Sequence, residues 1–205
     1  MRGHARLAAA VTVALLALLC MVGEASAQAA VRNGFWLEFG TGTGTVRNTC
    51  AGCANVTVAY GPTNHLRVGR TLTPRVLVGL ELFAMQSSEL VLGPGAAPVD
   101  AENGSLAPIV IWYVGDSGFF LKGGAGLASG TFTVQSTPGE PVTTERTGSG
   151  LTFGVGFDIA LMRWFALTAN LGTYVTAIGD VRVDDTVVDD VIATVYEAGI
   201  GFTFR

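Results

Sequence analysis

The chain has 205 residues, of which 49% are hydrophobic and 14% charged, and its formal net charge is −4. This length corresponds to one small domain. No basic stripe is present that would indicate a nucleic-acid partner, and after the first 27 residues no run of 18 apolar residues indicates a membrane-spanning helix.

Residues 1–27 have the features of a secretory signal peptide. Two arginines precede an uncharged apolar stretch at 7–23, and an Ala-Ser-Ala cleavage site ends at residue 27. A transmembrane helix is the rival interpretation, although the stretch is barely long enough. A lipoprotein is disfavoured because Leu, rather than Gly, Ala or Ser, precedes Cys20. We therefore expect export and a mature domain at 28–205, with 10 basic and 15 acidic residues and a net charge of −5.

Cys50 and Cys53 are the two cysteines of the expected mature chain. In an oxidising compartment such a pair tends to form a disulfide, which would staple a small loop. Redox chemistry would need a thioredoxin-like context, and a metal site would need two further ligands, for which His65 is the only mature histidine. A structural loop disulfide is the favoured interpretation, and the other two remain open.

Alternation of apolar and polar residues is the main structural signal. From Leu151 to Ile159 every odd position is apolar and every even position is Thr, Gly or Asp, and the pattern returns at 119–127, 165–175 and 196–204. Side chains of a strand alternate between two faces. The apolar face is broad and the other face is too thin for a soluble surface, which indicates a membrane β-barrel with its apolar side toward lipid.

Short turns alternate with long loops along the chain. Turns are expected at 73–75, 115–117 and 161–163, and loops rich in Gly, Pro, Ser, Thr and Asp near 45–55, 87–104, 135–148 and 179–190. These divide the chain into eight predicted strands, near 33–44, 56–72, 76–86, 105–114, 118–134, 149–160, 164–178 and 191–204. The predicted fold is an all-β, eight-stranded antiparallel up-and-down barrel in the outer membrane of a Gram-negative bacterium. Both mature termini would then be periplasmic.

Strand parity assigns the charged residues to the lumen. A three-residue turn at 73–75 would pair Leu72 with Val76, which places Arg67 opposite Glu81 inside the barrel. Lys122 and Asp158 fall on neighbouring strands and are expected to pair. The predicted lumenal charge network consists of Glu38, Arg67, Glu81, Lys122, Asp158 and Glu197, with His65 as a further candidate member. Buried charges are tolerated when paired.

Many inward positions are glycine, which leaves room for larger inward side chains, predicted to include Trp36, Phe83 and Trp112. An eight-stranded barrel is just wide enough for side chains to fill, so a plugged lumen is expected. Aromatic residues would form a girdle at the periplasmic interface. Its predicted members are Phe35, Tyr113, Phe119, Trp164, Phe165, Phe202 and Phe204, with Tyr60 and Tyr196 at the outer interface.

The chain resembles the small eight-stranded outer-membrane proteins of the OmpA/OmpX/opacity type. The resemblance spans the signal peptide and the mature chain, and it rests on the strand count, the loop asymmetry and the segments 34–40, 119–127 and 199–204. It implies insertion by the barrel-insertion machinery, which reads a C-terminal strand ending in an aromatic residue. Here Arg205 follows Phe204, which departs from that pattern. We expect no peptidoglycan-binding domain beside the barrel, so the resemblance does not imply peptidoglycan anchoring.

Three functions are consistent with such a barrel. The favoured one is a structural or surface-interaction role, in which a rigid barrel displays four loops to an unknown extracellular ligand. A narrow, porin-like channel is the alternative. A lipid-modifying enzyme is the second alternative, but His65 is expected to be a polar filler of the lumen, so we predict no enzyme and no cofactor. The expected partners are outer-membrane lipid, lipopolysaccharide and the insertion machinery, without nucleic acid.

The loop at 179–190 carries five aspartates, at 180, 184, 185, 189 and 190. Clustered carboxylates can bind Ca²⁺ or Mg²⁺, but their spacing does not match an EF-hand loop. A solvated acidic loop is the favoured interpretation.

Overall fold

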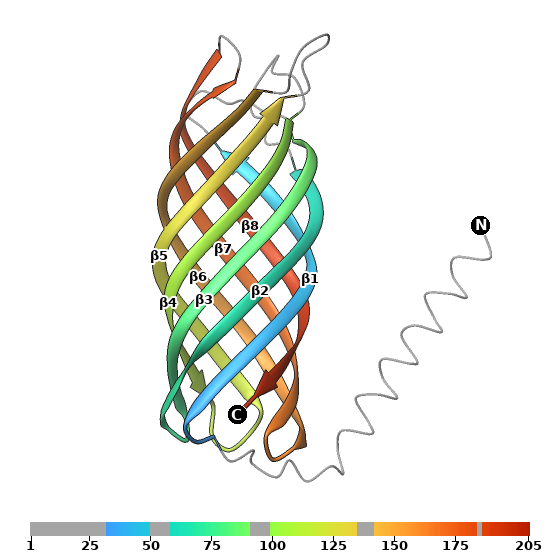
Figure 1. Ribbon diagram of the computed structural model, residues 1–205, viewed down its shortest axis with the longest axis vertical. Helices are drawn as coiled ribbons and strands as arrows, with labels where there is room; N and C mark the ends of the chain where they lie inside the picture. The colour runs from blue at the N-terminus through green and yellow to red at the C-terminus, as the bar shows by residue number, and fades with distance from the viewer. Residues whose placement is uncertain (1–31, 50–57, 91–98, 135–141, 184–185) are drawn as a thin grey trace, which may run out of the picture.

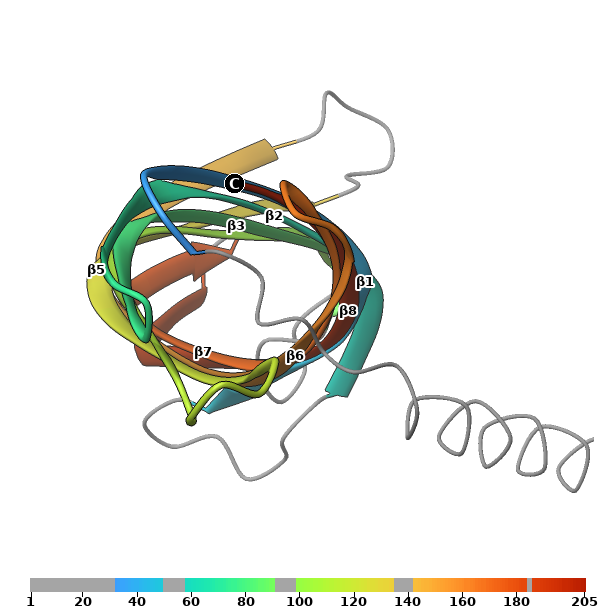
Figure 2. The same cartoon turned by 90° about the horizontal axis from the view of Figure 1, so that it is seen from below.

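The computed structural model describes residues 32–49, 58–90, 99–134, 142–183 and 186–205. Eight antiparallel strands account for most of them: β1 (Phe35–Thr49), β2 (Val58–Thr73), β3 (Val76–Leu90), β4 (Val99–Tyr113), β5 (Phe119–Val134), β6 (Val142–Met162), β7 (Phe165–Val183) and β8 (Thr186–Phe204). Each strand pairs with the next one, and β8 pairs with β1, so the sheet closes into an up-and-down barrel (Figures 1 and 2). The predicted fold class is confirmed. Within the described residues, no helix is long and apolar enough to cross a membrane.

The two ends of the barrel differ in their connections. At one end, short turns join β2 to β3, β4 to β5 and β6 to β7, as predicted. At the other, which we call the long-loop end, the strands continue further than predicted. β4 begins at Val99 instead of 105, β6 begins at Val142 instead of 149, and β7 and β8 extend through most of 179–190. Backbone pairing does not require apolar side chains, and the threonines of these segments are good strand formers.

The paired part of the predicted 179–190 loop is irregular. The register between β7 and β8 shifts on both sides of Gly179, which has a positive φ of 76°. Glycine adopts this conformation without the steric penalty that other residues incur. Such bulges end regular pairing and turn a strand, which explains why the segment has the composition of a loop.

The outer wall of the barrel is apolar. Leu80, Leu82, Leu127, Phe153 and Leu171 point outward and are 49%, 51%, 68%, 53% and 60% exposed. Near the short-turn end, aromatic rings from β1, β7, β8 and the β6–β7 turn contact one another. The centroid distances are 5.1–6.4 Å between the rings of Phe39, Trp164, Phe165, Phe202 and Phe204. This wall has the character expected of a lipid-facing surface with an interfacial aromatic belt.

The predicted faces of β4 were wrong by one residue near its end. Trp112 was expected in the lumen but is 48% exposed on the outer wall, whereas Tyr113 was expected in the girdle but is 2% exposed and points inward. Ile109 and Ile111 also point inward, while Val110 points outward. Both faces of this stretch are apolar, so alternation alone could not identify the inner one.

Side chains fill the described interior in layers. An apolar cluster occupies the long-loop half and includes Val46, Phe83, Met85, Phe132 and Val195. A second cluster lies toward the short turns, among them Trp36, Leu77, Ile111 and Phe120. Between and beside these clusters lie buried charged residues, as expected for the plugged lumen of an eight-stranded barrel.

Two inward glycines make the dense filling possible. A Cβ at Gly40 would lie 2.0 Å from Nε2 of His65, and a Cβ at Gly156 would lie 2.2 Å from the Phe120 ring. Neither side chain could keep its place against a larger residue. The glycines at these inward positions therefore provide the space that the bulky side chains crossing the lumen occupy.

Candidate functional site

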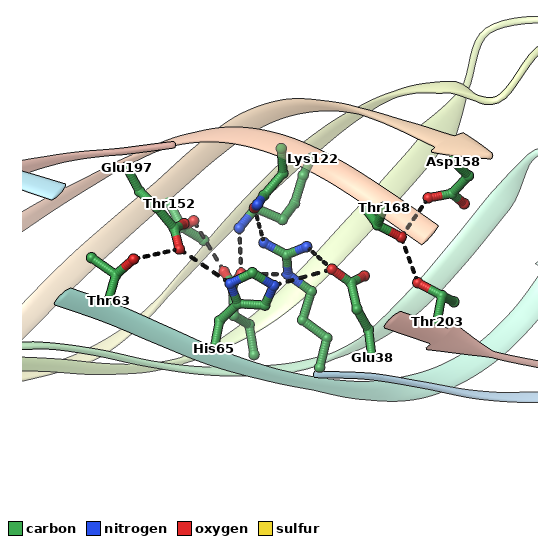
Figure 3. Close-up of polar contacts among 12 residues, drawn as sticks. Glu38, Thr63, His65, Lys122, Thr152, Asp158, Thr168, Glu197 and Thr203 are labelled. Carbon is green, nitrogen blue, oxygen red and sulfur yellow. Dashed lines mark hydrogen bonds and ion pairs between the residues drawn. The ribbon is translucent and has the colours of Figure 1, made fainter. Parts of the chain in front are cut away.

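A buried polar cluster spans the middle of the barrel (Figure 3). We call it the central network, and it consists of Glu38, Thr63, His65, Arg67, Glu81, Lys122, Thr152, Asn170, Tyr174 and Glu197. These residues come from all strands except β4. Five of the six residues predicted for a lumenal charge network, and His65, are brought together here.

Arg67 is the hub of the central network. Its guanidinium is fully buried and donates from Nε to Glu81 at 2.7 Å and from Nη1 to Glu38 at 2.5 Å. Nη2 donates to the side-chain oxygen of Asn170 at 3.0 Å. A planar guanidinium can hold several acceptors in fixed directions, which a lysine cannot. The predicted opposition of Arg67 and Glu81 is confirmed. The turn itself differs, because the register shifts between Thr71 and Thr73 and Val76 pairs with Thr73 instead of Leu72.

Glu81 also receives donors from the opposite wall. Lys122 donates to its Oε1, Thr152 donates to Oε2 at 3.1 Å, and the Tyr174 hydroxyl lies 3.2 Å from Oε1. The Tyr174 ring stacks on Phe83 with centroids 3.6 Å apart, which joins the charged layer to the apolar cluster beside it. Together with Arg67, these contacts connect Glu81 to charged and polar groups from four other strands, and its carboxylate is well satisfied.

The predicted pairing of Lys122 with Asp158 is wrong. Lys122 lies opposite Gly154 on β6, four positions along the strand from Asp158, or about 13 Å at 3.3 Å per residue. Its side chain passes over Gly154, where an added Cβ would lie 3.3 Å from Cε, and crosses the lumen to Glu81. In a narrow lumen, a side chain can pair across the barrel as well as with an adjacent strand. Strand parity predicts that a side chain points inward, but it does not predict such pairs across the lumen.

His65 lies between two carboxylates. Nε2 is 3.1 Å from Oε1 of Glu38, and Nδ1 is 3.2 Å from Oε1 of Glu197. Glu197 further accepts from the Thr63 hydroxyl at 3.0 Å and lies 3.0 Å from the Tyr174 hydroxyl. The four neutral members of the network are Thr63, Thr152, Asn170 and Tyr174, all at inward positions of their strands. They were not predicted as members, because the prediction considered charged residues.

Asp158 belongs to a separate cluster at the short-turn end. It accepts from Tyr113 at 2.6 Å, from Thr168 at 2.8 Å and from Arg205. Arg205 also donates to the Tyr113 hydroxyl at 3.0 Å. Burial lowers the pKa of the Arg205 guanidinium, but the neighbouring Tyr113 and Asp158 raise it more, so the pKa lies above its ordinary value and the group stays charged.

A second arginine, Arg32 just before β1, packs at the same end of the barrel. The guanidinium of Arg32 lies 3.5 Å from the centre of the Tyr113 ring and donates to the carbonyl of Ser117 at 2.9 Å. Stacking of a guanidinium on an aromatic face is favourable. Neither arginine was predicted as a site residue. The sequence nevertheless contained a signal for Arg205. Asp158 is an inward acid that requires a basic partner, and Arg205 lies two positions after the inward Thr203, on the same face of the chain.

Two predictions concern loop chemistry. Cys50 and Cys53 lie outside the described residues, as do Asp184 and Asp185. Within the described part of the chain, no group of three or more His, Cys, Asp or Glu side chains is arranged to hold a metal ion.

Comparisons with known proteins agree with this architecture. The family model described as the outer membrane protein beta-barrel domain matches residues 12–204. Ail of Yersinia pestis, solved in complex with the heparin analogue sucrose octasulfate, is similar at 15% identity and a TM-score of 0.52, covering 83% of this chain and 99% of Ail. Neisserial surface protein A is similar at 16% identity and a TM-score of 0.52, covering 82% and 96%.

Comparison with curated protein sequences gives no significant match. The two structural likenesses, at this level of identity, concern the fold. The family match covers nearly the whole barrel and agrees with the eight-strand topology, the apolar outer wall and the filled lumen. The chain therefore belongs to the outer membrane protein beta-barrel family, as a small eight-stranded barrel of the bacterial outer membrane.

Proposed function

We propose that the protein is a non-enzymatic surface scaffold, whose sealed barrel holds extracellular loops in fixed positions for an interaction partner. The observation that carries the proposal is the filled interior. Rigid scaffolds that carry variable loops commonly place binding on those loops.

Three features of the lumen argue against free passage of solutes. The Arg67 hub links opposite walls of the barrel and is 0% exposed. The stacked Phe83 and Tyr174 rings lie on the long-loop side of this hub. Arg32 and Arg205 pack around Tyr113 at the short-turn end. A solute would have to displace all three groups, including buried ion pairs that are costly to break.

The proposed orientation places the short turns in the periplasm and the long loops outside, as in other outer-membrane barrels. Arg205 donates its backbone N–H to Trp164 beside the β6–β7 turn, and Arg32 contacts the turns at Pro74 and Ser117. Both described ends of the chain therefore lie at the short-turn end. A signal peptide at residues 1–27 and insertion by the barrel-insertion machinery accord with this orientation and remain part of the proposal.

The charge of the long-loop end restricts the proposed loop ligand. The four predicted loop segments contain ten acidic residues, Glu89, Asp100, Glu102, Glu140, Glu145, Asp180, Asp184, Asp185, Asp189 and Asp190, and three basic ones, Arg47, Arg146 and Arg182. A polyanion such as the heparin analogue bound by Ail would be repelled. We therefore propose a neutral or cationic surface partner, with lipid and lipopolysaccharide surrounding the apolar wall.

Two measurements test the proposal. In planar bilayers, the refolded protein should give no steady single-channel conductance; steady conductance that Glu81→Gln alters would favour the channel alternative and overturn the sealed scaffold. On whole cells, binding should favour polycationic over polyanionic probes and should decrease when the segment 179–190 is shortened. Equal binding of both probe classes, unaffected by loop shortening, would contradict a display role.

A further inference from the structure

We propose that His65 is a proton-binding site of the lumen, at which a doubly protonated imidazolium acts as the third cation of the central network. The added proton would set the charge state of the barrel interior, whatever the loops bind. The atoms that face the imidazole ring and the charges around it favour this protonated state.

Both ring nitrogens of His65 face carboxylate oxygens. Nε2 is 3.1 Å from Glu38 and Nδ1 is 3.2 Å from Glu197, and the side chain of His65 is fully buried. An ionised carboxylate only accepts hydrogen bonds. A neutral imidazole has one N–H and one lone pair, so one ring nitrogen would direct its lone pair at an acceptor oxygen. Only the imidazolium donates from both nitrogens.

The remaining donors of the two carboxylates do not remove this requirement. Glu38 accepts from Arg67 on the same Oε1 that faces His65, and Glu197 accepts from Thr63 on the Oε1 that faces Nδ1. These donors stabilise both carboxylates in the ionised form. Each oxygen that the ring faces is therefore held as an acceptor.

The charge balance of the central network leads to the same result. The network contains three acids, Glu38 on β1, Glu81 on β3 and Glu197 on β8. Apart from His65 it contains two basic residues, Arg67 on β2 and Lys122 on β5. The Tyr174 hydroxyl of β7 lies between Glu81 and Glu197. With a neutral His65, the buried network would carry one uncompensated negative charge. Unpaired buried charge is strongly unfavourable. A protonated His65 makes three cations for three anions.

Gly40 supports a dedicated site. The glycine lies directly opposite His65 in the register of β1 and β2, and a Cβ there would meet the ring at 2.0 Å. The ring is thereby held between its two acceptors. Loss of the proton would leave this fixed ring without one of its two hydrogen bonds, and the seal of the lumen should weaken as the pH rises.

The test is nitrogen-15 NMR of the histidine ring in the refolded full chain, carrying His4→Gln so that His65 is the only histidine. An isolated histidine has a pKa of about 6.5 and is almost entirely neutral at pH 8. We expect both ring nitrogens of His65 to carry protons at pH 8. A spectrum with one unprotonated ring nitrogen at that pH would overturn the proposal.

Two variants make the result specific. Glu197→Gln should lower the pH at which the His65 ring loses its second proton by about 1 unit or more, because it removes a negative charge beside the ring. Glu102→Gln, which changes an exposed acid at the long-loop end, should change that pH by a negligible amount. An equal effect of both variants would show that the local pairing does not hold the proton. Folding of each variant is judged by comparing the gel mobility of unheated and boiled samples, which differs for a folded barrel. Should Glu197→Gln fail to fold, the spectrum of the parent protein at pH 8 still decides.

Discussion

Replacement of Arg67 by methionine should destabilise the barrel more than any other single change in the central network. Methionine approximates the length of the arginine stem but removes the guanidinium, and with it the hydrogen bonds to Glu81 at 2.7 Å, Glu38 at 2.5 Å and Asn170 at 3.0 Å. Two buried carboxylates then lose their principal counter-charge. Removal of one partner from a buried ion pair typically costs about 3–5 kcal/mol, and we expect a loss in this range.

The assay is equilibrium unfolding of the refolded protein in urea, with the free energy of unfolding obtained from the midpoint and slope. Arg67→Lys keeps the charge but loses the planar fork, so it should fall between the wild type and Arg67→Met. Arg70→Met is the matched control, because Arg70 lies on the same strand but is exposed; a change within about 0.5 kcal/mol is expected there. A loss below about 1 kcal/mol for Arg67→Met would refute the reasoning that Arg67 holds the network together.

Two further predictions test the packing and the faces of the barrel. Gly40→Ala should cost about 1–3 kcal/mol by overpacking against His65, whereas Gly123→Ala, whose Cβ would meet nothing closer than 4.0 Å, should leave the urea midpoint nearly unchanged; equal effects would contradict the close approach at Gly40. In single-tryptophan variants, brominated lipid should quench the fluorescence of Trp112, which is 48% exposed on the outer wall, but not that of Trp36, which is 1% exposed; strong quenching of Trp36 would reverse the assignment of faces.

The sequence predicted the barrel because its alternation repeats over many strands and depends on the membrane rather than on details of packing. Wherever one face was polar, parity was correct, and it placed Arg67 opposite Glu81. At Trp112 and Tyr113 both faces are apolar, because Ile109 and Ile111 fill the lumen there. The pattern then has no polar side that identifies the interior, and the prediction was reversed.

The composition of the charged cluster was predicted better than its contacts. Parity identifies which side chains point inward, but not which ones meet across the closed barrel. Lys122 reaches Glu81 over Gly154, and Asp158 is satisfied by Arg205 from the chain end. Both contacts depend on the tilt and closure of the sheet. The strand extensions at the long-loop end were missed for a different reason: their polar composition is that of loops, while their backbone pairing continues.

The central claim is that side chains fill the lumen around Arg67, and cysteine accessibility tests it most directly. In a chain with the native cysteines changed to serine, Thr152→Cys would place a thiol in the central network, where Thr152 is 2% exposed. Thr147→Cys would place one on the same strand at an exposed position. A small water-soluble thiol reagent should label residue 147 in the folded barrel and residue 152 only after unfolding. Rapid labelling of residue 152 in the folded protein would show a water-filled lumen and contradict the account.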